Sequence, residues 1–352
     1  MLTKKIKCPS CSYTTIVNGE PGDILSVTCD RCGRTGLFRF PSVDDIDTSQ
    51  PGMIEVKHLV KRYGSKTVVN DVTFSVRRGE IFGFLGPNGA GKTTTIKAIL
   101  GLIRIQSGDI TVNGFDMRSE CKRAKSCIGY LPERVSFYDN LTAMQNMLFY
   151  AEMKNAPKEE CRALIEAFGL GDVANKRVGT FSKGMVQRLG MARAILGDPP
   201  VLILDEPTEG LDARGVFFLR NKIKDLKRHG TTIFLSSHIL SEVQAVCDRV
   251  GIIDHGVLVA QDSVSNLSNK LDLKPKLVLE LESVSDNIIQ SLRGIDGVID
   301  YKVINRIIHV TCKPNVYAKI IVAVVNAGGN IVNIQTLMPS LEEIFLRYTG
   351  SS

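Results

Sequence analysis

The sequence predicts an α/β protein with a largely parallel sheet at its centre and a smaller module at each end of the chain. Short apolar segments, such as Glu80–Leu85 and Val201–Leu204, are typical of strands buried on both faces of a parallel sheet. Four cysteines lie close together within residues 1–40. Residues 274–352 show a third pattern, in which strands and helices follow each other in the order β-α-β-β-α-β.

Length and composition limit the number of domains and the classes of protein that are possible. A chain of 352 residues has room for two to three domains. Its 43% apolar and 23% charged residues exclude a wholly disordered chain, a collagen and a coiled coil. No apolar run reaches the roughly 18–20 residues that span a bilayer, and the first residues lack the apolar stretch of a signal peptide. We therefore expect a soluble, cytosolic protein. Its net charge of +7 permits contact with nucleic acid or anionic lipid without requiring either.

The cysteines of the first module form the pattern C-x2-C-x17-C-x2-C, through Cys8, Cys11, Cys29 and Cys32. Each pair turns two thiolates toward one point, and four sulfur ligands are what tetrahedral Zn²⁺ prefers. The total of nine cysteines is odd, which argues against a disulfide framework. Because about forty residues cannot build a sufficient core alone, we expect a metal to hold the module together.

This module resembles a zinc ribbon over residues 1–40. We expect its strands at Ser12–Val17, Ile24–Thr28 and Leu37–Phe40. Iron in a rubredoxin-like site and a redox pair are the alternatives for the cysteines. The basic residues of the module fit contact with nucleic acid and equally fit a solvated surface. Residues 41–52 are polar and acidic and carry prolines at either end, so they are predicted to be a linker.

A phosphate-binding loop is predicted where the strand Glu80–Leu85 meets the helical segment Thr95–Leu100. The residues between them follow G-x-x-x-x-G-K-[ST] and are Gly86, Pro87, Asn88, Gly89, Ala90, Gly91, Lys92, Thr93 and Thr94. Glycines let backbone N–H groups turn inward around phosphate oxygens, and the helix adds the positive end of its dipole. We expect Lys92 to reach the β- and γ-phosphates and the Thr93 hydroxyl to ligate Mg²⁺.

Two carboxylates follow the second buried strand, Val201–Leu204. Asp205 stands at the end of the strand, where a P-loop protein places the carboxylate that holds the Mg²⁺ shell. Glu206 is adjacent and is predicted to polarise the attacking water.

With these motifs, residues 53–270 resemble the nucleotide-binding subunit of an ATP-binding cassette (ABC) transporter. The segment Phe181–Arg188 stands where that family has its Leu-Ser-Gly-Gly-Gln signature; Ser182 and Gly184 match, whereas Lys183 and Met185 depart. The resemblance implies that a helical subdomain between Gln145 and Thr180 carries the signature, which caps the γ-phosphate bound by the opposite subunit.

The same resemblance implies roles for four further residues. Asp212 matches the aspartate of the D-loop, and His238 matches the switch histidine that contacts the γ-phosphate. Tyr63 occupies the place of the aromatic residue that stacks on adenine, with a packed core tyrosine as the alternative. Glu133 stands where the family normally has the glutamine of the loop that reaches the membrane partner. Residues 137–150 are expected to face that partner, although core packing explains their aromatic side chains equally well.

The C-terminal residues 274–352 are predicted to form a ferredoxin-like α+β domain with a regulatory or dimer-stabilising role. Its expected strands are Lys276–Leu281, Val298–Val303, Arg306–Thr311 and Asn330–Leu337, and its expected helices are Asp286–Arg293, Asn315–Ala327 and Ser340–Tyr348. The final segment, Pro339–Tyr348, resembles the tails of ATPases that serve ABC-2-type exporters.

The resemblance implies that two cassettes, as a homodimer or a heterodimer, sandwich two ATP molecules and drive a separate transmembrane permease, with export the favoured direction. The cofactors are then ATP and Mg²⁺, together with a structural Zn²⁺ in the ribbon. The expected location is the cytoplasm, peripheral on the inner face of the membrane through the permease, and nucleic acid is not an expected partner. The alternatives are a soluble ABC-type ATPase that acts on nucleic acid or ribosomes, and a metal-responsive regulatory ATPase.

Overall fold

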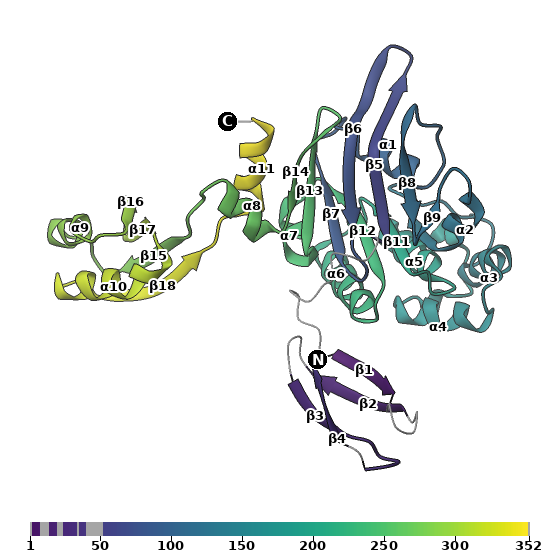
Figure 1. The fold of residues 1–352 in the computed structure, drawn as a ribbon, viewed down its shortest axis with the longest axis horizontal. Coiled ribbons are helices and arrows are strands. Elements are labelled where there is room, and N and C mark those ends of the chain that lie inside the picture. Colours follow the sequence, from purple (N-terminus) through teal and green to yellow (C-terminus); the bar gives the residue numbers. More distant parts are fainter. Residues whose placement is uncertain (1, 8–13, 20–23, 34, 40–51, 351–352) are drawn as a thin grey trace. The chain divides into compact units, whose positions relative to one another are not determined.

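A computed structural model describes residues 2–7, 14–19, 24–33, 35–39 and 52–350 of the chain. These residues form two compact units, Met1–Gly52 and Met53–Ser352. Each unit is described by itself below, and Figure 1 shows the elements of both.

The first unit consists of two antiparallel hairpins. One pairs β1 (Leu2–Lys7) with β2 (Thr14–Gly19), and the other pairs β3 (Ile24–Thr28) with β4 (Thr35–Arg39). The strand predicted at Ile24–Thr28 is present with the same bounds, whereas β1 was not predicted. Strand β1 has the sequence Leu-Thr-Lys-Lys-Ile-Lys, which lacks a regular alternation of apolar and polar residues.

The centre of the second unit is a six-stranded sheet in the order β10-β11-β12-β7-β13-β14. All neighbours run parallel except β13 and β14, which are antiparallel. The strands are β7 (Ile81–Leu85), β10 (Ile128–Leu131), β11 (Val201–Asp205), β12 (Thr232–Ser237), β13 (Arg249–Asp254) and β14 (Val257–Asp262). Every residue of β7, β11 and β12 is buried, as predicted for a parallel sheet covered on both faces.

A second, four-stranded antiparallel sheet in the order β6-β5-β8-β9 covers one side of this centre. Its strands are β5 (Ile54–Tyr63), β6 (Lys66–Val76), β8 (Ser107–Val112) and β9 (Phe115–Asp116). Helix α1 (Lys92–Ile99) shares the core between the sheets. Phe74 of β6 stacks on Phe82 and Phe234 of the central sheet, with ring centroids 5.6 and 5.7 Å apart. This aromatic cluster fixes the two sheets against each other.

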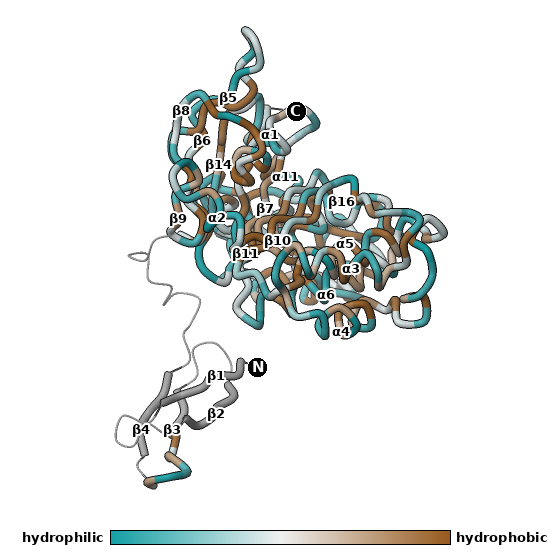
Figure 2. Tube along the Cα trace, turned by 90° about the vertical axis from the view of Figure 1, so that its right-hand side faces the viewer, coloured by the Kyte–Doolittle hydropathy of each residue, from teal (hydrophilic) through white to brown (hydrophobic). Residues whose placement is uncertain are grey.

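Helices enclose the opposite side of the central sheet. They are α3 (Ala143–Lys154), α4 (Glu159–Ala167), α5 (Lys183–Ile195), α6 (Ala213–Arg228), α7 (Leu240–Val246) and α8 (Val264–Lys270), with 3₁₀ turns at Gly171–Val173 and Val178–Thr180. Helix α2 (Cys121–Ser126) lies instead with the second sheet, where Ala124 joins the core between the two sheets. The side chains of α3, α4 and α5 form one core with the central sheet. Strands β7, β10 and β11 are apolar along most of their length in Figure 2, because helices and the second sheet shield them from water.

Residues 276–337 form an antiparallel sheet in the order β16-β17-β15-β18. Its strands are β15 (Lys276–Leu281), β16 (Val298–Ile304), β17 (Ile307–Cys312) and β18 (Ile331–Leu337). Helices α9 (Asp286–Arg293) and α10 (Tyr317–Asn326) pack their buried residues on one face of the sheet, and a 3₁₀ turn at Pro314–Val316 precedes α10. The order of elements is the predicted β-α-β-β-α-β.

The last helix, α11 (Leu341–Thr349), packs away from this sheet. Leu341 and Ile344 belong to the core that the central sheet forms with its helices, together with Val243 of α7 and Leu267 of α8. The backbone N–H of Leu341 donates to the Gln244 side chain at 2.9 Å. Ser340 caps the helix by accepting a hydrogen bond from the N–H of Glu343. The predicted C-terminal domain therefore ends in a helix that is anchored on the cassette.

Candidate active site

The loop between β7 and α1 has the geometry of an anion cradle. Helix α1 begins at Lys92 with no side chain capping its N-terminus, so its first N–H groups point into the pocket described below. Gly91 has a φ of +111°, and a Cβ atom there would lie 3.0 Å from the Val68 carbonyl oxygen. A Cβ atom on Gly86 would lie 2.4 Å from the Ile253 carbonyl oxygen. Both positions therefore require glycine.

Lys92 is held inside this loop. Its Nζ donates to the carbonyl oxygen of Gly86 at 2.7 Å and to that of Pro87 at 3.3 Å. The Pro87 carbonyl also accepts from the N–H of Ala90, which tightens the turn. Burial lowers the pKa of the Lys92 ammonium, because a buried charge lacks solvation. A bound anion would offset that cost.

Asp205 is placed by the register between β11 and β12, which sets it opposite Ser236. The Ser236 hydroxyl donates to Oδ1 of Asp205 at 2.6 Å and accepts from the backbone N–H of Glu206 at 3.1 Å. Burial raises the pKa of the Asp205 carboxyl above its ordinary value, although the Ser236 hydrogen bond acts to lower it. A cation beside this carboxylate would stabilise the charged form.

The side chain of Glu206, which follows β11, lies close to residues that follow two other strands of the sheet. Its Oε2 lies 2.8 Å from Nδ1 of His238, and its Oε1 lies 3.8 Å from Nζ of Lys92. The backbone of Glu206 has a φ of +49°, an uncommon conformation that functional sites often contain. Lys92 follows β7, Glu206 follows β11 and His238 follows β12, so the parallel sheet brings all three to one edge.

Nine of the predicted site residues line one open pocket at this edge. The predicted residues in its lining are Asn88, Gly89, Gly91, Lys92, Thr93, Thr94, Glu133, Glu206 and His238. Val68 and Glu209 line it as well, and the sequence analysis did not single them out. The pocket therefore brings together the loop between β7 and α1, the strand-end residue Glu206 and His238.

Eight residues predicted for the nucleotide site are absent from this lining, namely Tyr63, Gly86, Pro87, Ala90, Ser182, Gly184, Asp205 and Asp212. Ser182 caps α5 by accepting from the N–H of Met185, and Asp212 caps α6 by accepting from the N–H of Gly215. Gly184 stands in the first turn of α5. The chain's own fold thus does not bring the signature segment to the pocket of the same chain.

Tyr63 lies at the end of β5 and is 49% exposed, which excludes the alternative of a packed core tyrosine. The ammonium of Lys61 lies 4.5 Å from the centroid of its ring. Tyr63 is absent from the pocket lining, whereas Val68 on the neighbouring strand is part of it.

Some aromatic residues after Glu133 pack inside the protein, and others are exposed on its surface. Phe137 packs edge-on against Tyr150, and the Arg193 guanidinium lies 5.0 Å from the Phe137 ring centroid. Tyr138 is exposed and packs against the exposed Phe149. Phe137 therefore serves packing, whereas Tyr138 and Phe149 leave an aromatic surface open.

Sequence reasoning missed two residues that support the site. Ser236 orients Asp205 and Glu206, and its signal was the pair of serines that precedes His238. Gln187 is buried, and its Nε2 donates to the carbonyl oxygen of Pro207 at 2.8 Å. This bond ties the helix of the signature segment to the loop that follows Glu206.

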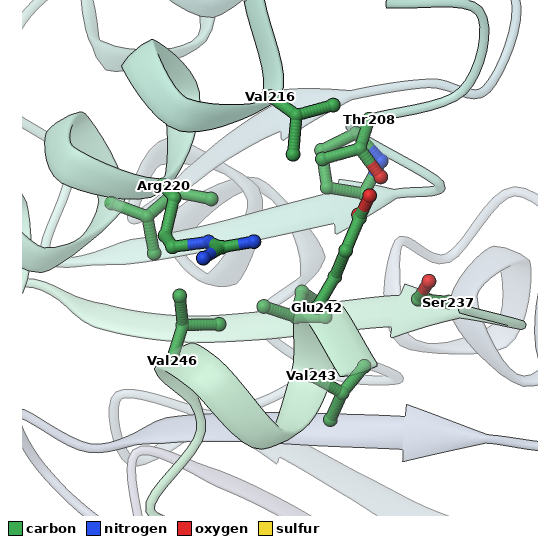
Figure 3. Close-up of a pocket in the computed structure, with 10 residues that line it drawn as sticks. Thr208, Val216, Arg220, Ser237, Glu242, Val243 and Val246 are labelled. Carbon is green, nitrogen blue, oxygen red and sulfur yellow. The ribbon is translucent and has the colours of Figure 1, made fainter. Parts of the chain in front are cut away.

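A small, mainly apolar pocket lies behind that loop, and Figure 3 shows its lining. Pro207 and Thr208 line it, with Arg220 of α6 and Glu242 of α7 directed into it. Oε2 of Glu242 is buried and has no hydrogen-bond partner within the described part of the chain.

A phosphate-binding loop, a buried strand-end aspartate and an adjacent glutamate on a parallel sheet define the class of P-loop nucleoside triphosphatases. Comparisons with known proteins narrow this class. The pattern of the family described as ABC transporter matches residues 69–209.

Similar proteins extend the comparison over most of the chain. The linearmycin resistance ATP-binding protein LnrL of Bacillus subtilis (strain 168) is 33% identical over 306 residues, covering 85% of this chain and 98% of LnrL. The bacitracin transport ATP-binding protein BcrA of Bacillus licheniformis is 39% identical over 305 residues, covering 85% of this chain and 97% of BcrA. A solved structure of an ATP binding subunit of an ABC transporter has a TM-score of 0.59 and 33% identity, and covers 63% of this chain and 94% of its own.

The chain belongs to the ABC transporter ATP-binding proteins, and its enzymatic activity is ATP hydrolysis. Within the described residues, no helix has the length and apolar character needed to cross a bilayer.

Proposed function

We propose that the pocket at the carboxyl edge of the central sheet binds Mg-ATP and that its hydrolysis drives a separate transmembrane permease. The observation that carries this proposal is the convergence of Lys92, Glu206 and His238 from three different strand ends. Residues brought together from distant parts of a chain around a polar pocket are typical of a catalytic site.

In this proposal the loop and Lys92 hold the phosphates of ATP. The free N–H groups at the start of α1 receive phosphate oxygens, and Lys92 exchanges its carbonyl partners for the nucleotide. Thr93 and Asp205 would hold Mg²⁺, which supplies charge neutralisation on the phosphates when bound. Burial raises the pKa of the Asp205 carboxyl, and a cation beside it would stabilise the charged form, which supports that assignment.

Glu206 is the proposed general base. Its carboxylate lines the pocket and is free to take a proton from a water that attacks the terminal phosphate. His238 holds that carboxylate through Nδ1 and through its own backbone N–H at 3.3 Å. We assign His238 the role of orienting Glu206 and contacting the γ-phosphate. Tyr63 is proposed to stack on adenine, and Glu133 to link the pocket with the permease.

Ser182, Gly184 and Asp212 are proposed to complete the pocket of a second cassette. Their positions support this assignment, because Ser182 and Asp212 are exposed and none of the three lines the pocket of its own chain. The Ser182 hydroxyl and the first N–H groups of α5 suit the capping of a phosphate. Two chains, identical or different, would then sandwich two nucleotides.

The direction we favour is export, with the chain on the cytoplasmic face of a membrane through its permease. LnrL is named for resistance to linearmycin and BcrA for the transport of bacitracin, and both are similar over nearly their whole length. The exposed aromatic residues Tyr138 and Phe149 offer a surface for a helix of the permease.

For the two flanking parts we propose a zinc ribbon at residues 1–40 and a ferredoxin-like domain within 274–352. Cys29 and Cys32 lie on the turn between β3 and β4, where the N–H of Gly33 bonds to the carbonyl of Cys29 at 2.9 Å. Cys8 and Cys11 lie outside the described residues, and among those described no three ligand-type side chains meet to hold a metal. The antiparallel strand order β16-β17-β15-β18 supports the ferredoxin-like assignment.

The proposal is tested by titrating Mg-ATP into Lys92→Ala and Lys97→Ala by calorimetry. Both lysines are on α1, but Lys97 is exposed and Lys92 is buried in the pocket. We expect Lys92→Ala to lose affinity by about a hundredfold and Lys97→Ala to keep it, since a buried charge pair is worth about 3 kcal/mol. Equal affinity in both variants would contradict the assignment of the pocket.

A further inference from the structure

The lining of the nucleotide pocket contains more acidic than basic residues. Its acidic residues are Glu133, Glu206 and Glu209, and within the described part of the chain its one lysine is Lys92. The phosphates of a nucleotide are themselves anionic, and like charges that lie close together repel each other. A nucleotide therefore binds well here only if positive groups offset these carboxylates.

Glu209 has a positive partner that is not part of the pocket lining. Nζ of Lys183 lies 4.0 Å from Oε1 of Glu209. Lys183 is the first residue of α5 and directly follows Ser182, which caps that helix. The Glu209 carboxylate is therefore within reach of both the pocket and the signature segment of the same chain.

The position of Lys183 in its helix favours an anionic partner. The first turn of a helix carries the positive end of the dipole, which repels a lysine, and the first turn of α5 contains no acidic residue to compensate. The stem of Lys183 lies over Gly210, where an added Cβ atom would be 2.8 Å from Cδ and 2.5 Å from Cε of the lysine. The missing side chain of Gly210 thus leaves the space through which the lysine reaches Glu209.

The loop that carries Glu209 is itself firmly held. The N–H of Glu209 donates to the carbonyl oxygen of Glu206 at 3.1 Å, which forms a turn directly after the proposed base. Gln187 lies one turn further along α5 than Lys183 and donates to the carbonyl oxygen of Pro207 at 2.8 Å. Two side chains from one face of α5 therefore contact the loop that begins at Glu206.

We propose that Lys183 is a positioning residue for the ATP pocket of its own chain and acts through Glu209. By holding the Glu209 carboxylate, Lys183 offsets a negative charge that would otherwise repel the phosphates, and so it raises the affinity for Mg-ATP. Lys183 stands where the signature of the ABC family has a glycine, which has no side chain to reach Glu209. The inference rests on the proposed function, because it takes the pocket to be the site of Mg-ATP.

The same ion pair connects the pocket with the signature segment. Coupling between two equilibria is reciprocal, so if the pair favours bound ATP, then bound ATP favours the pair. ATP in a chain's own pocket would then fix the start of α5. That start contains Ser182 and Gly184, which are proposed to cap the nucleotide of a second cassette.

The test is a double-mutant cycle in the full chain carrying Glu206→Gln, which is expected to hold ATP without hydrolysing it. Lys183→Met removes the charge and keeps a stem over Gly210, and Glu209→Gln removes the carboxylate. The two changes are made singly and together. Mg-ATP is titrated by calorimetry at a chain concentration that sedimentation shows to be monomeric, so that no second signature segment contributes.

Two further variants serve as controls in the same background. Lys183→Arg keeps the positive charge beside Glu209 and is expected to keep the affinity of the parent. Arg162→Met breaks another exposed ion pair, between Arg162 and Glu166 of α4, whose side chains are 57% and 54% exposed against 64% and 44% for Lys183 and Glu209. We expect Arg162→Met to leave the affinity unchanged, because neither of its residues lines the pocket.

We expect Lys183→Met to weaken Mg-ATP binding about two- to fivefold, the size of effect found for exposed ion pairs. Adding Glu209→Gln should restore the affinity of the parent, since no carboxylate is then left uncompensated. The loss in Lys183→Met should also shrink in 1 M salt, where charges are screened beyond about 3 Å. A purely structural role of Lys183 predicts neither the restoration nor the salt dependence.

Unchanged affinity in Lys183→Met would overturn the inference. A loss that Glu209→Gln does not restore would also overturn it, because Lys183 would then act on the nucleotide directly or through the stability of α5. A parent that fails to bind Mg-ATP would contradict the proposed function together with this inference. A parent that binds Mg-ATP with an affinity that no change at Lys183 alters would contradict this inference alone.

Discussion

Nδ1 of His238 lies 2.8 Å from Oε2 of Glu206, although the two residues are 32 positions apart in the chain. The other carboxylate oxygen of Glu206 lies 3.8 Å from Nζ of Lys92. The proposed base is therefore held between a histidine and a lysine before any nucleotide arrives.

Glu206→Gln is expected to bind ATP and to hydrolyse it very slowly. Glutamine keeps the size of the side chain and an oxygen for His238, but it cannot accept the proton of the attacking water. We expect phosphate release to fall by about 10²- to 10⁴-fold, with ATP affinity within about threefold of the parent. Phosphate-release kinetics and equilibrium binding check this. Near-normal turnover would remove Glu206 from the role of base.

Ser236→Ala is expected to slow hydrolysis without preventing ATP binding. The hydroxyl donates to Asp205 at 2.6 Å and accepts from the Glu206 N–H at 3.1 Å, so its loss frees both acidic residues at once. A hydrogen bond to a charged group is worth about 1.5–3 kcal/mol, which corresponds to a fall in kcat of about ten- to a hundredfold. Ser237→Ala is the matched control, because that buried hydroxyl bonds instead to the Ile239 N–H. An equal loss of kcat in both variants would argue against a special role for Ser236.

Asp205→Asn is expected to stabilise the protein without nucleotide and to abolish the stabilisation that Mg-ATP brings. Burial raises the pKa of Asp205 above 3.8, so the folded state binds this proton more tightly than the unfolded state does. The stability of the parent therefore falls as pH rises from about 3.8 to the raised pKa, a penalty that asparagine avoids. At pH 7 we expect the Tm of the variant to be higher by about 2 °C.

Thermal unfolding at pH 4 and pH 7, with and without Mg-ATP, measures this effect. The difference in Tm between variant and parent should be larger at pH 7 than at pH 4. A variant that is less stable than the parent at both pH values would contradict the burial argument. A variant that gains as much as the parent from Mg-ATP would contradict the assignment of Asp205 to the metal.

The ribbon is expected to bind one Zn²⁺ per chain, measured by elemental analysis of protein purified without chelators. Cys29→Ser/Cys32→Ser should lose the metal and keep ATP affinity, because the phosphate loop belongs to a separate compact unit. Cys121→Ser/Cys127→Ser is the control, since these two partly exposed cysteines lie in the cassette. Iron in place of zinc would support the rubredoxin-like alternative, and loss of ATP binding would show that the two units depend on each other.

Much of the fold was predictable because its signals are local. The strand at Lys276–Leu281 and the helix at Asp286–Arg293 have the predicted bounds, since alternation and helical spacing act over a few residues. The phosphate loop was predictable for the same reason, because strand, glycines and helix are consecutive. The N-terminal strand β1 was not predicted because its three lysines leave no regular alternation of apolar and polar residues. Its strand conformation is stabilised by antiparallel pairing with β2, which lies further along the chain.

The sequence by itself determined the chemistry of this protein, through residue types fixed at short spacings. The tertiary structure decided which of those residues meet. The register of β11 on β12 places Ser236 beside Asp205, and the parallel order of β11, β12 and β7 gathers Glu206, His238 and Lys92. It also anchors α11 on the cassette and brings Lys183 to Glu209. These relationships depend on contacts between residues far apart in the chain, which no local pattern encodes.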